Sequence, residues 1–164
     1  NERYIIMSAI AIAFIHLAKK EKRPIWIIEF NGALKYEQSM DSEGNCFLYE
    51  SPADFTHLVA GVAKRSPSGG TDFDKPITRC LNTDPNAVKA DMIMVTDGCA
   101  SLAPEVESRV NEFKEKGMKF YTILLGIRAK HLEGISDEIV DLEKLDSESA
   151  DNAVGSIMNS VSTS

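Results

Sequence analysis

The sequence predicts an α/β domain built on an open, doubly wound and mostly parallel sheet with one antiparallel edge strand. Three observations lead to this prediction. Short apolar stretches typical of buried strands alternate along the chain with longer stretches typical of helices. Most of the short stretches are apolar on both faces, which is typical of parallel strands covered by helices on each side. The pair Asn31-Gly32 follows the first of them directly and is a strong hairpin signal.

The composition fits one globular domain that spans residues 1–164. The chain is 43% apolar, which suffices for a core, and it shows neither an internal repeat nor a low-complexity linker. Its net charge of −7 argues against nucleic acid or an anionic membrane as partner, because both attract basic surfaces. Its three cysteines include no C-x-x-C pair, so a disulfide framework and a zinc site are not indicated. A cytoplasmic location is therefore expected.

The N-terminal half predicts two helices around a hairpin. Residues 2–20 form an apolar stretch with helical length, and a membrane span is not expected because its uncharged part is shorter than ~20 residues. Residues 25–30 predict a buried strand. After the Asn-Gly turn, residues 33–39 alternate apolar and charged side chains and predict the antiparallel edge strand. Residues 51–65 predict the second helix.

The C-terminal half continues the alternation of strands and helices. Three stretches are short and rich in β-branched or other apolar residues, and three carry helical patterns with suitable N-terminal residues. The predicted strands are residues 91–96, 119–125 and 138–142, and the predicted helices are residues 73–81, 104–116 and 149–160.

Two loops carry the residues best suited to bind a ligand. Asp97 ends the strand at residues 91–96, and the loop Gly69-Gly70-Thr71-Asp72 precedes a helix. Ligands of open parallel sheets bind beyond the carboxyl ends of the strands. Carboxylate and hydroxyl oxygens suit a hard cation such as Mg²⁺. The sequence therefore predicts a cation site that contains Thr71 and Asp97.

Each loop also has a purely structural interpretation. Thr71 to Asp74 fits a capping box for the helix that follows, in which Thr71 is only the N-cap. Asp97-Gly98 is a common turn pair at the end of a strand. The two loops together, in this topology, favour a site more strongly than either loop alone.

These motifs resemble those of the von Willebrand factor A (vWA) domain, a Rossmann-like fold. The string S-G-G-T-D at residues 68–72 resembles the second motif of that family, and T-D-G at residues 96–98 resembles the third. The strings I-I-E-F-N, G-G-T-D-F and A-D-M-I-M-V-T-D-G are similar to those of the bacterial ViaA-like group. With the order of the elements, the resemblance covers nearly the whole chain.

The resemblance implies a protein-binding module rather than an enzyme. A metal-ion-dependent adhesion site (MIDAS) would hold Mg²⁺ or Mn²⁺, and an acidic residue of the partner protein would complete its coordination. Thr71 would contribute its hydroxyl, Asp97 would act through a bridging water, and Asp72 would support the site without touching the ion. The same resemblance implies a MoxR-type AAA+ ATPase as the partner.

The first motif of the family, D-x-S-x-S, does not occur in the chain. In the family it ends a central strand just before the first long helix, so the domain is expected to be N-terminally incomplete at Asn1. Roughly 15 to 25 further residues would supply that strand and its loop. The strand would lie between the strands predicted at residues 25–30 and 91–96.

Two other functions remain open. A degenerate vWA domain would bind its partner by surface shape, without metal. A receiver-like domain would use Asp97 as a phosphoryl acceptor, but the paired acidic residues and the lysine that such a domain needs are not evident.

Overall fold

The computed structural model describes residues 2–21, 26–28, 30, 47–48, 72–83, 91–97, 100–126, 130–142, 144 and 146–162. Within these residues, a three-stranded parallel sheet is flanked by helices. The coarse prediction of an α/β domain with a parallel sheet is therefore confirmed. None of the described helices is both long and apolar enough to span a lipid bilayer.

The parallel sheet has the strand order β3-β4-β5. Its strands are β3 (Asp91–Thr96), β4 (Lys119–Leu125) and β5 (Glu138–Leu142), with the same bounds as the predicted strands. Both pairings are parallel, and helices α4 (Pro104–Glu115) and α5 (Lys130–Glu133) lie in the two connections. Sequential strands are thus neighbours, and each connection carries a helix, as the βαβ unit requires.

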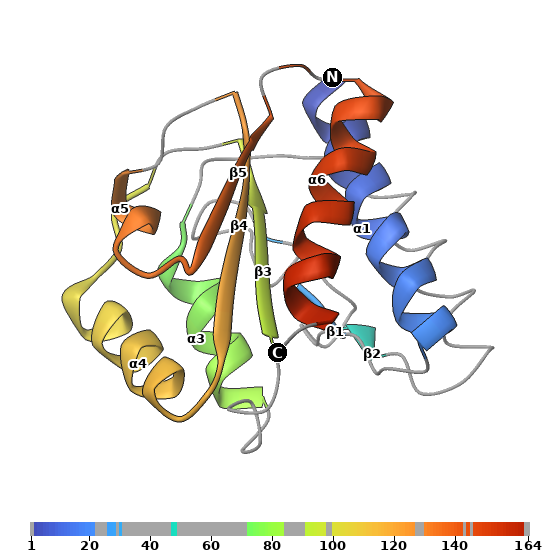
Figure 1. Cartoon of the computed structure of the whole chain (residues 1–164). Helices are drawn as coiled ribbons and strands as arrows, with labels where there is room; N and C mark the ends of the chain where they lie inside the picture. The colour runs from blue at the N-terminus through green and yellow to red at the C-terminus, as the bar shows by residue number, and fades with distance from the viewer. Residues whose placement is uncertain are drawn as a thin grey trace.

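Helices cover both faces of this sheet (Figure 1). On one face lie α1 (Glu2–Glu21) and α6 (Ser147–Ser162), which also contact each other. On the other face lie α3 (Asp74–Thr83) and α4. The described sheet is therefore the middle of three layers. The predicted bounds of these four helices differ from the observed ones by one or two residues, and α5 was not predicted.

Strand β4 divides its buried side chains between the two faces. Phe120 and Leu124 belong to the core beneath α3 and α4, whereas Ile123 and Leu125 belong to the core beneath α1 and α6. This alternation follows from the period of two in a strand. Strand β4 is the central strand of the described sheet, and nearly all of it is therefore buried.

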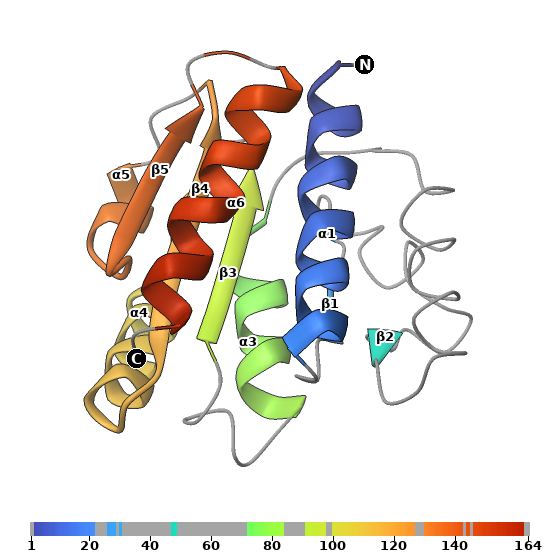
Figure 2. The same ribbon diagram turned by 45° about the vertical axis from the view of Figure 1, so that its right-hand side comes forward.

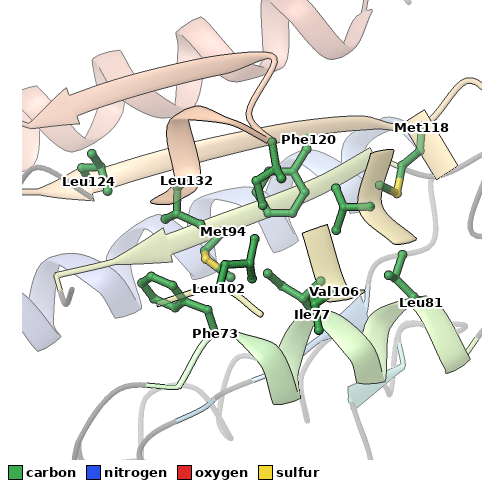
Figure 3. Close-up of a cluster of buried hydrophobic side chains, with 12 residues drawn as sticks. Phe73, Ile77, Leu81, Met94, Leu102, Val106, Met118, Phe120, Leu124 and Leu132 are labelled. Carbon is green, nitrogen blue, oxygen red and sulfur yellow. The ribbon is translucent and has the colours of Figure 1, made fainter. Parts of the chain in front are cut away.

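The core beneath α3 and α4 is built from side chains of both layers (Figure 3). Helix α3 contributes Ile77 and Leu81, and Phe73 precedes its first residue. From the sheet, Met94 and Phe120 meet these side chains. Apolar residues at this spacing on α3 form one stripe facing the sheet, and that stripe fixes which side of the helix is buried.

The core beneath α1 and α6 depends on a helix that is apolar on nearly all sides. Ile6, Ile10 and Phe14 of α1 are buried against this face of the sheet and α6. Ile5, on another side of α1, is 64% exposed. The apolar surface of α1 therefore exceeds what the described neighbours cover.

A second, two-stranded sheet holds the antiparallel pairing. Strand β1 (Trp26–Ile27) pairs with β2 (Phe47–Leu48), and neither is hydrogen-bonded to the parallel sheet. The predicted antiparallel edge strand at residues 33–39 and the predicted helix at residues 51–65 lie outside the described residues. An antiparallel edge strand on the parallel sheet is accordingly not part of the described structure, and β2 is an element that the sequence did not predict.

Candidate functional site

The carboxyl ends of the parallel strands form the candidate site. Figure 2 shows that β3, β4 and β5 point toward the end of the molecule where α1 and α6 begin. The residue that follows β3 is Asp97, and the residue that follows β4 is Gly126. Since helices in such folds run back along the sheet, their N-termini collect at this edge. The edge therefore combines strand ends, helix starts and a carboxylate.

Asp97 is described, and its side chain is partly exposed. Its Oδ2 lies 3.9 Å from Nη1 of Arg3, and the side chains are 37% and 42% exposed respectively. Arg3 lies in the first turn of α1, 94 positions earlier in the chain than Asp97. The fold thus brings a guanidinium to the predicted site, a residue that sequence reasoning did not select.

Gly126, the residue after β4, also lies near the Arg3 guanidinium. Its φ is +76°, in the region that glycine adopts without a steric penalty. A Cβ atom placed on Gly126 would lie 4.0 Å from Nη2 of Arg3. Arg3 therefore reaches across the carboxyl ends of both β3 and β4.

The second predicted loop is described only from Asp72 onward, and Thr71 lies outside the described residues. Oδ1 of Asp72 accepts hydrogen bonds from the backbone N–H groups of Asp74 (2.9 Å) and Lys75 (3.3 Å). The side chain of Asp72 thus caps the first turn of α3. The sequence offered Thr71 as the N-cap of this helix, and that prediction falls outside the described residues.

Asp74 serves the fold at the same edge. Its Oδ1 accepts a hydrogen bond of 2.8 Å from the backbone N–H of Ala103. Ala103 is the N-cap residue of α4, and its methyl side chain cannot accept a hydrogen bond from the N–H groups in the first turn of that helix. One carboxylate thereby joins the start of α3 to the start of α4.

The segment after β1 reaches the same region. The rings of Phe30 and Phe73 meet edge to face, with centroids 6.4 Å apart and an interplanar angle of 75°. Phe73 lies between the Asp72 cap and α3, so Phe30 packs against the residues that lead from the predicted metal loop into the helix. Phe30 is partly buried against the core beneath α3 and α4.

One feature of this arrangement, the accessible carboxylate of Asp97, suits a weakly held, hard cation. Mg²⁺ in proteins is often bound through one or two carboxylates, with waters in its other positions, and an accessible carboxylate such as Asp97 suits that mode. Within the described ranges, no group of three or more His, Cys, Asp or Glu side chains is placed to hold a metal. A cation at Asp97 would therefore need further ligands from water or from outside the described residues.

Polar contacts away from this edge support the fold. The hydroxyls of Thr122 and Ser136 lie 2.7 Å apart, and Ser136 also donates to the carbonyl of Leu132. Thr122 is fully buried, so this pairing satisfies a hydroxyl inside the core. Sequence reasoning did not select these residues, because single hydroxyls in and after strands carry no distinctive pattern.

A second group joins α4, β4 and the residue before β5. Lys114 donates from Nζ to the carbonyl oxygen of Ile135 (2.8 Å) and lies 3.4 Å from Oδ1 of Asp137. Asp137 in turn accepts from the backbone N–H of Phe120 (2.8 Å).

A third group joins β5 to α6. Glu138 of β5 accepts hydrogen bonds from the hydroxyls of Ser156 (2.8 Å) and Ser160 (2.5 Å) of α6. These contacts join elements of the fold and lie outside the candidate site.

Two titratable groups outside the site respond to their surroundings. Hydrogen bonding from the backbone and side chain of Ser149 lowers the pKa of Asp146 at the start of α6. Burial, followed by the nearby charges of Asp91, Asp137 and Glu138, raises the pKa of Tyr121. Both effects have structural causes, a helix cap and a core position.

Comparison with known proteins adds one distant relative. No family model matches the chain. The chain is 26% identical over 155 residues to the "Uncharacterized protein MJ0811" of Methanocaldococcus jannaschii. The aligned region covers 92% of this chain and 33% of that protein, so the chain spans about a third of the length of the curated relative that it matches.

Proposed function

We propose that this chain is a protein-binding module, not an enzyme, that holds Mg²⁺ or Mn²⁺ at the carboxyl edge of its sheet and binds an acidic residue of a partner. The observation that supports the proposal best is Asp97. It is a partly exposed carboxylate directly after a parallel strand, at the edge where such sheets bind ligands. The T-D-G string that contains Asp97 and the S-G-G-T-D loop resemble vWA motifs. This resemblance is the reason for proposing metal-dependent protein binding.

In this proposal Asp97 binds the ion through a bridging water, and Thr71 contributes its hydroxyl. Bound Mg²⁺ would supply a positive charge that attracts a carboxylate of the partner protein. Asp72 and Asp74 keep their described roles, since their Oδ1 atoms already accept backbone hydrogen bonds from the start of α3 and the start of α4 respectively. They hold the loop that follows Thr71 in place. A MoxR-type AAA+ ATPase is the partner that the resemblance suggests.

The proposal includes the complete vWA architecture. A further strand would lie between β1 and β3, and residues 33–39 would form the antiparallel edge strand. Among the described strands, β3 pairs with β4 alone, and β1 belongs to a separate sheet. Yet β3 is apolar on both of its faces, a pattern more typical of an interior strand than of an edge strand. The apolar pattern of β3 therefore supports this part of the proposal.

The proposal is tested by the thermal stability of the protein in EDTA and in millimolar Mg²⁺. A ligand that binds only the native state at a hundredfold excess over its Kd stabilises it by about 2.7 kcal/mol. For a domain of this size we expect a rise in Tm of about 5–10 °C. The rise should vanish in Asp97→Asn and in Thr71→Ala.

Glu115→Gln provides the matched control. Glu115 is an exposed carboxylate at the end of α4, near the amino end of β4, so its loss changes the net charge equally at the opposite edge of the sheet. This variant should keep the full Mg²⁺ response. A cooperative melt of the wild-type protein with no response to Mg²⁺ or Mn²⁺ would contradict metal-dependent binding.

One observation favours a second candidate function, a vWA-like interaction domain that works without metal. Arg3 already places a positive charge beside Asp97. In such a domain the guanidinium itself would receive an acidic group of the partner, because arginine binds carboxylates well. Partner binding that is unchanged by EDTA and lost in Arg3→Gln would select this function over the metal-dependent one.

A further inference from the structure

The side of α1 that is turned away from the core carries exposed apolar residues. Ile5 is 64% exposed, and within the described part of the chain no other large apolar side chain is as accessible. Ala9 is exposed as well, and Ile12 is half-buried. Ile6 and Ile10 lie on the opposite side of the helix and are buried against the sheet and α6. Accessible apolar residues that gather on one side of a helix indicate an interaction surface.

This outer stripe of α1 has the spacing of a coiled-coil seam. Its six positions follow one another at alternating steps of three and four residues, and they are Glu2, Ile5, Ala9, Ile12, His16 and Lys19. Such steps average about 3.5 residues, the repeat with which two helices pack side by side. The three apolar positions are consecutive, and polar residues border them at both ends. The outer stripe is therefore suited to pack against another helix.

The order of residues along the outer stripe is complementary to itself in an antiparallel pair. A twofold axis between Ala9 and Ile12 places Ala9 of one copy opposite Ile12 of the other. The same register places Glu2 opposite Lys19 of the second copy, twice by symmetry. A parallel pair would instead place glutamate beside glutamate and lysine beside lysine, which is unfavourable. Charge complementarity thus favours a second copy of this chain in antiparallel orientation.

We propose that the outer stripe of α1 binds the outer stripe of a second copy, so that the protein forms an antiparallel dimer. This inference goes beyond the proposed function and requires no metal. The helix of 20 residues is about 30 Å long, and one pair of such helices belongs to the small class of specific interfaces. We therefore expect a reversible dimer with a Kd on the order of 10 μM.

The dimer has a consequence for the candidate site. Helix α1 begins at the end of the molecule toward which the parallel strands point (Figure 2). An antiparallel pair of α1 helices therefore directs the two carboxyl edges, each with its Asp97, toward opposite ends of the dimer. Two such sites on one particle can bind two partners, or two places on one large partner.

The first experiment is sedimentation velocity of the whole chain between about 1 and about 200 μM, a range that brackets the expected Kd. Ala9→Glu places a charge beside the twofold axis in both copies and should weaken the dimer by more than about tenfold. Because Ala9 is exposed, the core is left intact. Asn111→Glu is the matched control. It adds the same charge at an exposed position of α4, on the other face of the sheet, and should dimerise like the wild-type protein.

The second experiment reverses the charges at the two ends of the outer stripe. Glu2→Lys and Lys19→Glu each bring like charges together and should weaken the dimer about two- to tenfold at low ionic strength. The double variant should recover the wild-type Kd. Both substitutions oppose the helix dipole of α1, so recovery in the double variant cannot come from a more stable helix.

Each outcome supports or overturns the proposal. A wild-type dimer that is lost in Ala9→Glu and kept in Asn111→Glu supports it. A wild-type protein that stays monomeric over the whole range leaves the outer stripe to a different partner and overturns it. So does a dimer that Ala9→Glu leaves unchanged, since its interface lies elsewhere. If both single reversals weaken the dimer and the double variant does not recover, the antiparallel register is refuted.

Discussion

The two faces of the sheet are covered in different ways. Between β3 and β4 on one side and α3 and α4 on the other, directional polar contacts accompany the apolar core. Asp74 joins the two helices through Ala103, and Lys114 joins α4 to the residues before β5. On the opposite face α1 and α6 meet through buried aliphatic and aromatic side chains, and hydroxyls of α6 donate to Glu138 of β5.

The difference matters because the two kinds of contact constrain position differently. Hydrogen bonds are directional, so they fix the start of α3 and α4 relative to the strand ends. Apolar packing follows buried area and is non-directional. The start of α3 is therefore fixed by directional contacts as well as by buried area. Arg3 of α1 is 42% exposed, so its guanidinium can change position without displacing the buried face of that helix.

The largest expected effect compares one buried isoleucine on each face. Ile77 of α3 is 1% exposed and Ile10 of α1 is 0% exposed. Substitution of either by alanine should lower the free energy of unfolding by about 2–5 kcal/mol, because each removes buried methyl groups and leaves a cavity. We expect the two losses to agree within ~1 kcal/mol in urea denaturation. A negligible loss for Ile10→Ala would show that α1 is not docked as described.

A smaller effect tests the polar contact that distinguishes the α3 and α4 face. Asp74→Ala removes the acceptor of the Ala103 N–H and should cost about 1–3 kcal/mol. Asp74→Asn keeps an oxygen at that position and should lose distinctly less. Chemical denaturation at pH 7 measures both variants. Equal stability of Asp74→Ala and the wild-type protein would mean that this contact does not fasten the two helices.

The smallest effect concerns the α1 and α6 face at the start of α6. Oδ1 of Asp146 accepts the N–H of Ser149 at 2.8 Å, and this lowers the pKa of Asp146 below its ordinary value of 3.8. A lowered carboxyl pKa stabilises the fold above the unfolded-state pKa, and this contribution is lost as the pH falls through the folded-state pKa. Asp146→Ala should therefore melt slightly below the wild type near neutral pH.

That difference should narrow as the pH falls below about 3.8, because the carboxyl group is protonated first in the unfolded state and then, at the lower folded-state pKa, in the folded state. Asp146→Asn retains a capping oxygen, so its deficit should be smaller than that of Asp146→Ala, and it should narrow in the same pH range because the titrating carboxyl belongs to the wild-type protein. Melting curves of the three proteins between pH 3 and pH 7 provide the measurement. A deficit of Asp146→Ala that is independent of pH would contradict a role for the ionised cap.

Much of the described fold was predictable, because local patterns determine it. The three parallel strands have the predicted bounds, since their apolar runs are short and end at clear turn residues. The helix ends differ by one or two residues, where caps rather than apolar periodicity decide the boundary. Strand β2 was missed because two residues, Phe47–Leu48, are too few to show alternation.

The candidate site was predictable in part. Asp97 was found because a carboxylate that ends a buried parallel strand lies at the ligand-binding edge of such sheets. Arg3 could not be found in the same way. It is a single basic residue in a helix, and only the packing of α1 against the rest of the domain brings it to a carboxylate 94 positions away. Contacts between distant segments leave no local signature in the sequence.

The contact between α1 and α6 closes a loop that contains most of the chain, from the end of the first helix to the start of the last. The entropy of closing a flexible loop grows only with the logarithm of its length, by about 0.6 kcal/mol for each doubling. Insertions between these two helices therefore weaken their contact very little. The contact between α1 and α6 is therefore compatible with loops of widely different length at the carboxyl edge between them.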